Sequence, residues 1–104
     1  MVIPNLRIDS ERLLADFQQL SEIGASRLSL SPEDLTARAW FADRVDDAGL
    51  LVCDDDAGNL SGVLKSRNPA AKTLLVGSHL DTVPNGGRYD GSIGVLAGLE
   101  CLRT

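Results

Sequence analysis

The stretch of sequence that decides the fold spans residues 73–91 and reads TLLVGSHLDTVPNGGRYDG. Its first seven residues form a mainly apolar run that ends in small and polar residues, which is typical of a buried strand whose carboxyl end opens into a site. Residues 82–88 are rich in Pro, Asn and Gly and predict a loop. We therefore expect a buried strand over residues 73–79 and a helix that begins after the loop, at about Gly91.

The residues that follow Gly91 have the apolar spacing of a helix. Apolar residues recur there at every third position, with Val95 beside them, and they are Ile93, Leu96, Leu99 and Leu102. Gly94 and Gly98 lie four residues apart in this segment, which would let its backbone approach a neighbour closely. We therefore expect this last helix to pack against a sheet.

Residues 10–24 predict a first helix. Their apolar residues fall at intervals of three and four, which marks one face of a helix, and they are Leu13, Leu14, Phe17, Leu20 and Ile23. Asp9 or Ser10 would cap the amino end of this helix, and Gly24 would end it.

A second helix is expected to begin at Pro32 and to end at Gly49. Ser31 can accept hydrogen bonds from the free amides of the first turn, and Pro32 suits the first helical position. Glu33 and Asp34 favour the positive end of the helix dipole. The apolar face of this helix is expected to comprise Leu35, Ala39, Trp40, Phe41 and Val45.

Residues 50–53 and 60–64 are strand candidates, and the connector 54–59 (DDDAGN) is typical of a solvated hairpin turn. Asp54 and Asp56 have the first spacing of a calcium-binding EF-hand loop. The later positions do not fit that loop, because a glycine stands where a ligand is needed. The hairpin turn is therefore the favoured interpretation.

The composition fits one small domain. The chain has 104 residues, of which 43% are hydrophobic, and this content disfavours disorder. A net charge of −5 argues against a nucleic-acid or anionic-membrane surface, since both favour basic patches. The order helix, helix, hairpin, buried strand and helix predicts an α/β fold.

The two cysteines, Cys53 and Cys101, are too few for a disulfide framework, and they lack the CxxC spacing of a redox or metal pair. We expect them to be buried thiols of a cytoplasmic protein. No apolar run approaches the roughly 20 residues that a membrane-spanning helix needs.

The single histidine of the chain, His79, stands at the end of the expected strand. Asp81 follows two residues later, and side chains two apart on a strand point to the same side. This arrangement suits a metal-binding imidazole whose second nitrogen is held by the acid. Asp90, brought back by the glycine-rich loop, could add a carboxylate oxygen, and these donors suit zinc or a similar metal.

Each of these residues also has a purely structural interpretation. His79 could be a hydrogen-bonded histidine at a strand end, Asp81 could initiate a turn, and Asp90 could cap the last helix. The spacing alone leaves both interpretations open. A phosphate-binding loop is less favoured, because no glycine-rich phosphate motif is present and the two acids would repel a phosphate.

Residues 77–100, GSHLDTVPNGGRYDGSIGVLAGLE, closely resemble the first metal-binding motif of the M20 metallopeptidase family, in its amidase, hydantoinase and carbamoylase branch. That branch includes N-carbamoyl-L-amino acid hydrolases, ureidopropionases and allantoate amidohydrolases. The short spacing between Asp81 and Asp90 points to this branch, and residues 31–62 also resemble it. The resemblance implies the start of a metallo-exopeptidase-like catalytic domain.

The resemblance also implies roles for three residues. His79 and Asp90 would be metal ligands, with Asp90 bridging two divalent ions (Zn, Mn, Co or Ni), and Asp81 would orient His79. The peptide bond after Asp90 is expected to be cis. The implied reaction is metal-dependent hydrolysis of a carbamoyl or ureido C–N bond, in substrates such as N-carbamoyl-L-amino acids or allantoate, with a glutamate as general base. The resemblance also implies that the full-length enzyme is a homodimer. Its binding partner would be the small-molecule substrate, and it would bind neither nucleic acid nor a membrane.

Part of the implied site has no counterpart in these residues. In the family, the general-base glutamate, two further histidines and a lid domain follow later in the chain. Glu100 is the only acid after Asp90, and we expect it to be a solvated helix residue about 15 Å further along the axis. We therefore expect residues 1–104 to be the N-terminal portion of the catalytic domain of a longer enzyme, and to be inactive alone. The alternative is a non-catalytic interaction or regulatory module.

Overall fold

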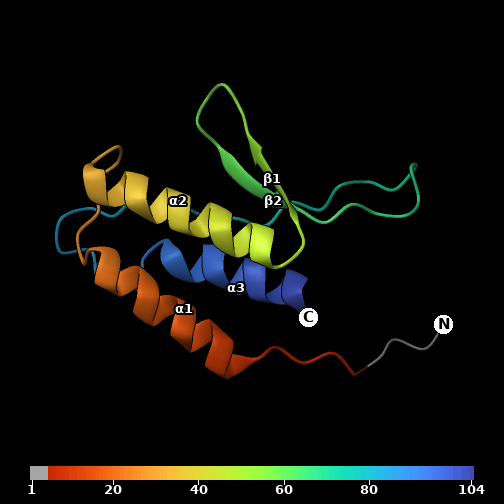
Figure 1. The fold of residues 1–104 in the computed structure, drawn as a ribbon, viewed down its shortest axis with the longest axis horizontal. Helices are drawn as coiled ribbons and strands as arrows, with labels where there is room; N and C mark the ends of the chain where they lie inside the picture. The colour runs from red at the N-terminus through yellow and green to blue at the C-terminus, as the bar shows by residue number, and fades with distance from the viewer. Residues whose placement is uncertain (1–4) are drawn as a thin grey trace.

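The computed structural model describes residues 5–104 and contains three helices and a two-stranded sheet (Figure 1). In chain order the elements are α1 (Ser10–Ile23), α2 (Pro32–Asp47), β1 (Leu51–Asp54), β2 (Leu60–Val63) and α3 (Ser92–Arg103). α1 packs against both α2 and α3, and the hairpin packs against α2. The predicted α/β class, the three helices and the hairpin are confirmed.

The first two helices begin where their capping residues predict. The Asp9 carboxylate accepts a hydrogen bond from the Arg12 backbone N–H at 3.1 Å, so Asp9 is the cap of α1. The Ser31 hydroxyl accepts from the Asp34 backbone N–H at 3.2 Å, and Pro32 occupies the first helical position of α2. Gly49 takes a φ of 77° just beyond α2, a conformation that glycine adopts at low cost.

The hairpin is antiparallel, with Leu51 opposite Val63 and Asp54 opposite Leu60. Its turn is held by Asp55, whose carboxylate accepts hydrogen bonds from the Ala57 and Asn59 backbone N–H groups at 2.9 and 2.8 Å. Hydrogen bonds from the Asn59 side chain and backbone lower the pKa of Asp55. The connector is therefore a side-chain-stabilised turn, as expected.

The prediction of a strand over residues 73–79 is wrong. These residues are extended but form no strand, and Leu74 and Leu75 are 88% and 85% exposed. A strand needs a neighbour that completes its ladder of hydrogen bonds. β1 and β2 pair with each other, and no other described segment pairs with residues 73–79.

The same segment does pack closely against α3 at the two predicted glycines. A Cβ built on Gly94 would lie 2.8 Å from the Ser78 Cβ, and one on Gly98 would lie 3.4 Å from a Val76 methyl. The expected close approach at this face of α3 is therefore present. Its neighbour is a single extended segment instead of a sheet.

Several apolar positions of the predicted helix faces are exposed instead, namely Leu14, Leu35, Ala39, Ile93 and Leu102. Polar residues take part of the inner faces in their place, and these are Asp16, Asp34, Ser92 and Glu100. These groups are buried with hydrogen-bond partners, which offsets the loss of their hydration. The spacing of apolar residues therefore predicts the buried face of each helix only in part.

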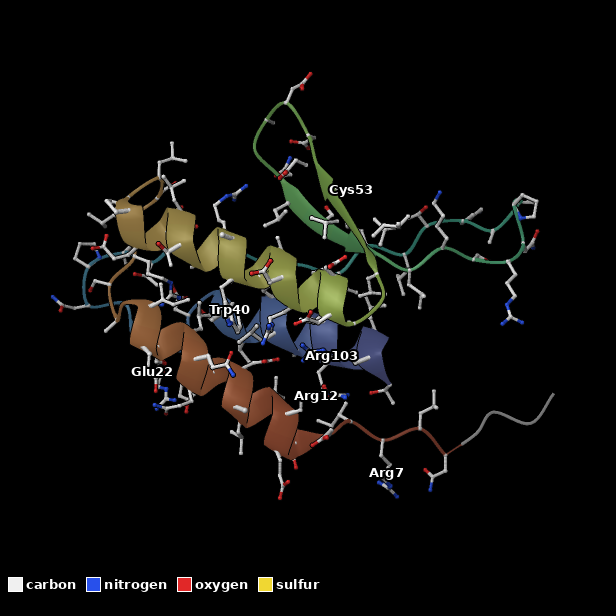
Figure 2. All side chains as sticks on the ribbon, viewed as in Figure 1. Arg7, Arg12, Glu22, Trp40, Cys53 and Arg103 are labelled. Atoms are coloured by element: carbon white, nitrogen blue, oxygen red, sulfur yellow. The ribbon has the colours of Figure 1, made fainter. Side chains whose placement is uncertain are left out.

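The prediction of buried thiols is also wrong. Cys53 and Cys101 are both exposed. Cys53 lies on β1, all four residues of which are exposed, and the turn end of the hairpin points away from the helices (Figure 2). Cys101 follows the buried Glu100 on α3 and faces outward.

None of the helices in the described part of the chain is long and apolar enough to cross a membrane.

Two ion pairs join α1 to α3, and one of them overturns the expectation for Glu100. Glu100 is fully buried and accepts hydrogen bonds from the Arg12 Nε at 2.8 and 3.0 Å. The hydrogen bond to Glu100 raises the pKa of Arg12. One turn away on each helix, Arg103 donates to the Asp16 carboxylate at 2.6 Å. Glu100 is therefore a structural residue of the α1–α3 contact.

The Asp16–Arg103 pair generates a stability prediction. Only 5% of the Asp16 side chain and 10% of the Arg103 side chain are exposed. Arg103→Met would leave a buried carboxylate without a partner, so we expect the free energy of unfolding to fall by about 3 kcal/mol or more. Urea denaturation followed by circular dichroism measures this change.

Arg38→Met is the matched control. The Arg38–Asp54 pair is 4.0 Å long, its Asp54 side chain is 69% exposed, and the hydrogen bond from Arg38 to the Gly58 carbonyl is also exposed, so the loss of both should change the free energy of unfolding by less than about 1 kcal/mol. Equal effects in the two variants would contradict the structural role of the buried pair.

Candidate metal centre

His79 ends the extended segment, and its ring nitrogens differ in what they face. Nδ1 lies 2.8 Å from the backbone oxygen of Asp81 and 3.6 Å from the Asp81 carboxylate. Only the shorter contact is a hydrogen bond. A carbonyl oxygen can only accept, so Nδ1 carries a proton, and in the neutral form of the ring Nε2 holds the free lone pair. In that form one ring nitrogen is available to a ligand.

The backbone that follows Asp90 comes close to His79 at Gly91. Gly91 has a φ of 73°, and a Cβ at this position would overlap the His79 imidazole and carbonyl. Only glycine therefore permits the chain to pass this close to the ring. The Asp90 carboxylate is exposed and makes no hydrogen bond or ion pair with the described residues, which leaves its oxygens free.

The expected cis peptide bond after Asp90 is absent, because every peptide bond in residues 5–104 is trans. The chain turns into α3 with a positive φ at Gly91 and a trans bond before it.

The core holds the Asp90 side of the candidate site in place. The Tyr89 ring packs edge-on against Phe17 of α1, with centroids 5.3 Å apart and an interplanar angle of 71°. The Ile93 N–H donates to the Tyr89 carbonyl at 3.1 Å, which starts α3. Asp90 therefore sits between a core-anchored aromatic ring and the first turn of a helix.

The His79 side is held by a segment that sequence reasoning missed. The Arg27 N–H donates to the Thr82 hydroxyl at 2.8 Å, and the Thr82 N–H donates to the Arg27 carbonyl at 2.6 Å. Arg27 is only 2% exposed, whereas its neighbours Leu28 and Leu30 are 51% and 74% exposed. This inverts the usual preference of these residue types, so no pattern in the sequence signals it.

The donors near His79 fit part of a metal site. The free Nε2 of His79 and the carboxylate of Asp90 are nitrogen and oxygen donors of the kind that zinc accepts. Within residues 5–104, however, no three His, Cys, Asp or Glu side chains are grouped so that they could hold a metal ion. Any complete coordination sphere would need donors from outside these residues.

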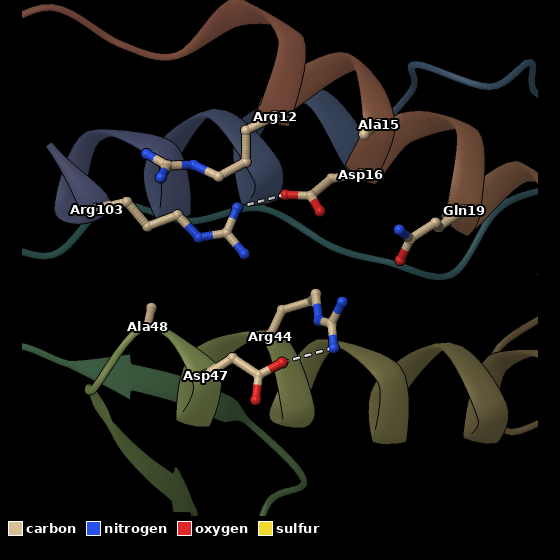
Figure 3. A pocket seen from close by; sticks show the side chains of 8 residues that line it. All are labelled: Arg12, Ala15, Asp16, Gln19, Arg44, Asp47, Ala48 and Arg103. Carbon is tan, nitrogen blue, oxygen red and sulfur yellow. Dashed lines mark hydrogen bonds and ion pairs between the residues drawn. The ribbon is translucent and has the colours of Figure 1, made fainter.

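A cleft in the described residues lies elsewhere. It has a volume of about 440 Å³ between α1, α2 and the end of α3, and none of its lining residues belongs to residues 73–91 (Figure 3). Its three arginines are each paired with an acid at 2.6 Å: Arg12 with Glu100, Arg44 with Asp47 and Arg103 with Asp16. These ion pairs leave little free charge to recognise a ligand.

Comparison with known proteins places the chain in context. No protein-family model matches it. It is 45% identical over 103 residues to an N-carbamoyl-L-amino acid amidohydrolase of Geobacillus stearothermophilus, a match that covers 93% of this chain and 25% of the relative. It is also 34% identical over 101 residues to an allantoate amidohydrolase of Bacillus subtilis, covering 97% of this chain and 24% of that protein.

The fold has the same relatives. The crystal structure of a hydantoinase/carbamoylase family amidase from Burkholderia ambifaria matches with a TM-score of 0.90 and 43% identity, over 94% of this chain and 26% of that one. The chain thus spans about a quarter of the length of the relatives it matches. Over this quarter, the chain is homologous in sequence and in fold to the hydantoinase/carbamoylase amidases.

Proposed function

We propose that His79 and Asp90 are metal ligands of an amidohydrolase that cleaves linear carbamoyl or ureido C–N bonds. One observation carries this proposal: the Gly91 backbone passes against the His79 ring, so that an imidazole and a carboxylate that no residue of 5–104 pairs with come from adjoining backbone. These are the two residues that the motif resemblance assigns to the metal.

The residues of this chain would act by holding donors in place. The Asp81 carbonyl accepts a hydrogen bond from the Nδ1–H of His79 and thereby favours the tautomer that offers Nε2. Asp90 would offer a carboxylate able to bridge two ions. A divalent metal bound there would polarise the substrate carbonyl and lower the pKa of a water molecule. The general base and the remaining ligands would come from outside residues 5–104.

The relatives support the substrate class. The names of two of them specify N-carbamoyl-L-amino acids and allantoate, which share a carbamoyl or ureido C–N bond. We therefore propose a substrate with that group. Two-metal loading, the choice among Zn, Mn, Co and Ni, a homodimeric state and a cytoplasmic location stay predictions from the resemblance.

A chimera tests the ligand assignment. This chain would replace the matching 45% identical segment of the Geobacillus stearothermophilus amidohydrolase. We expect the chimera to bind metal and to hydrolyse an N-carbamoyl-L-amino acid. His79→Ala or Asp90→Ala should abolish metal loading, because each removes a donor. Elemental analysis after gel filtration measures the metal.

Asp56→Ala is the control for that experiment, since Asp56 is an exposed acid of the hairpin turn. It should leave both metal content and turnover unchanged. Full metal occupancy in His79→Ala or Asp90→Ala would contradict the assignment.

The chain alone should be inactive. Its described residues offer too few grouped donors to complete a metal site, so we expect no turnover of N-carbamoyl-L-amino acids or allantoate with added Zn²⁺, Mn²⁺, Co²⁺ or Ni²⁺. A colorimetric ammonia assay measures this. Metal-dependent turnover above the background of the His79→Ala chain would refute the expectation. An inactive chain whose chimera is also inactive would favour a non-catalytic module.

A further inference from the structure

We propose that Arg27 is a positioning residue, whose guanidinium fixes the His79 segment relative to the Asp90 segment. Its importance for metal binding rests on the function proposed above. The clamp itself can be tested without a metal.

The guanidinium donates to three segments of the chain. Its Nε donates to the Leu80 carbonyl at 3.1 Å, and one terminal nitrogen donates to the Ser92 hydroxyl at 3.0 Å. The other terminal nitrogen donates to the Gly24 carbonyl at 2.6 Å. Leu80 directly follows His79, and Ser92 follows Asp90 by two residues. One planar group therefore ties the end of α1 to both sides of the candidate site.

The shape of the guanidinium makes this tie rigid. Its donors point outward in one plane at fixed angles, so three acceptors satisfied together have little freedom to move. The backbone of Arg27 adds a second tie, through its paired hydrogen bonds with Thr82. Residues 80–82 are thus held both by the backbone and by the side chain of one residue.

The charge of Arg27 is placed differently from that of the other buried arginine. Arg103 meets a carboxylate directly, whereas all three acceptors of the Arg27 guanidinium are neutral oxygens. Burial lowers the pKa of Arg27, and the carboxylates of Asp34 and Asp81 partly oppose this shift. A buried charge without a direct counterion is a weak means of stabilising a fold.

The alternative side chains cannot supply the same contacts. An apolar residue of similar volume would leave the Leu80 carbonyl and the Ser92 hydroxyl without this donor. Lysine would keep the charge, but it has one nitrogen and cannot reach three separated acceptors with fixed geometry. The contacts therefore specify arginine by geometry, which is what a positioning role requires.

The experiment uses the full 104-residue chain, whose single histidine gives an unambiguous NMR signal. The close approach of Gly91 to the His79 ring predicts a nuclear Overhauser effect between the imidazole Hε1 and the Gly91 Hα protons. We expect the Arg27→Lys variant to lack this nuclear Overhauser effect while its circular dichroism spectrum remains that of the folded chain. Ser92→Ala, which removes a single acceptor, should weaken it.

Arg103→Lys is the matched control, because it alters a buried arginine that touches neither side of the site. It should retain the His79–Gly91 effect even where the stability falls. An effect that persists in both Arg27→Lys and Ser92→Ala would overturn the proposal. So would its equal loss in Arg27→Lys and Arg103→Lys, since that result would mean general loosening.

A Zn²⁺ titration of the chimera against a chromophoric chelator separates the clamp from the proposed function, because the chain alone lacks the donors of a complete metal site. We expect Arg27→Lys to weaken Zn²⁺ binding about tenfold or more relative to wild type, the usual effect of losing a residue that supports a ligand, and Arg103→Lys to leave it unchanged. A wild-type chimera that binds no Zn²⁺ would count against the metal site. The nuclear Overhauser result would still decide the clamp.

Discussion

The arrangement of the candidate site depends on one buried group, the guanidinium of Arg27. It donates to the Leu80 carbonyl after His79 and to the Ser92 hydroxyl after Asp90. Between these anchors runs a loop that is exposed over most of its length. Such a loop has no core of its own to hold its ends. The relative position of the two candidate ligands is therefore set by contacts to the end of α1, outside the motif that contains them.

The rest of the packing keeps those anchors in register. α3 carries Ser92 at its first position, and the pairs Arg12–Glu100 and Asp16–Arg103 fix α3 against α1. Because α1 leads directly into the Arg27 segment, both ends of the clamp belong to one packed unit. The Tyr89 ring on Phe17 adds an apolar contact to the same face. Electrostatic and apolar contacts thus act on the same geometry.

The sequence predicted local features well and long-range ones poorly. Asp9 and Ser31 cap their helices as expected, because a cap needs only its own first turn. The strand over residues 73–79 was predicted wrongly, because a strand depends on a partner that its own residues do not specify. Glu100 and Arg27 were missed for the same reason. Their burial depends on partners 88 and 53 to 65 positions away in the chain.

The most direct test of the central claim is anomalous X-ray diffraction at the zinc absorption edge, from crystals of the chimera with the Geobacillus stearothermophilus amidohydrolase. The account predicts an anomalous peak at roughly 2.0–2.2 Å from both the His79 Nε2 and an Asp90 carboxylate oxygen. It also predicts that the His79 Nδ1 remains hydrogen-bonded to the Asp81 carbonyl. Zinc bound without contact to His79 or to Asp90 would contradict it.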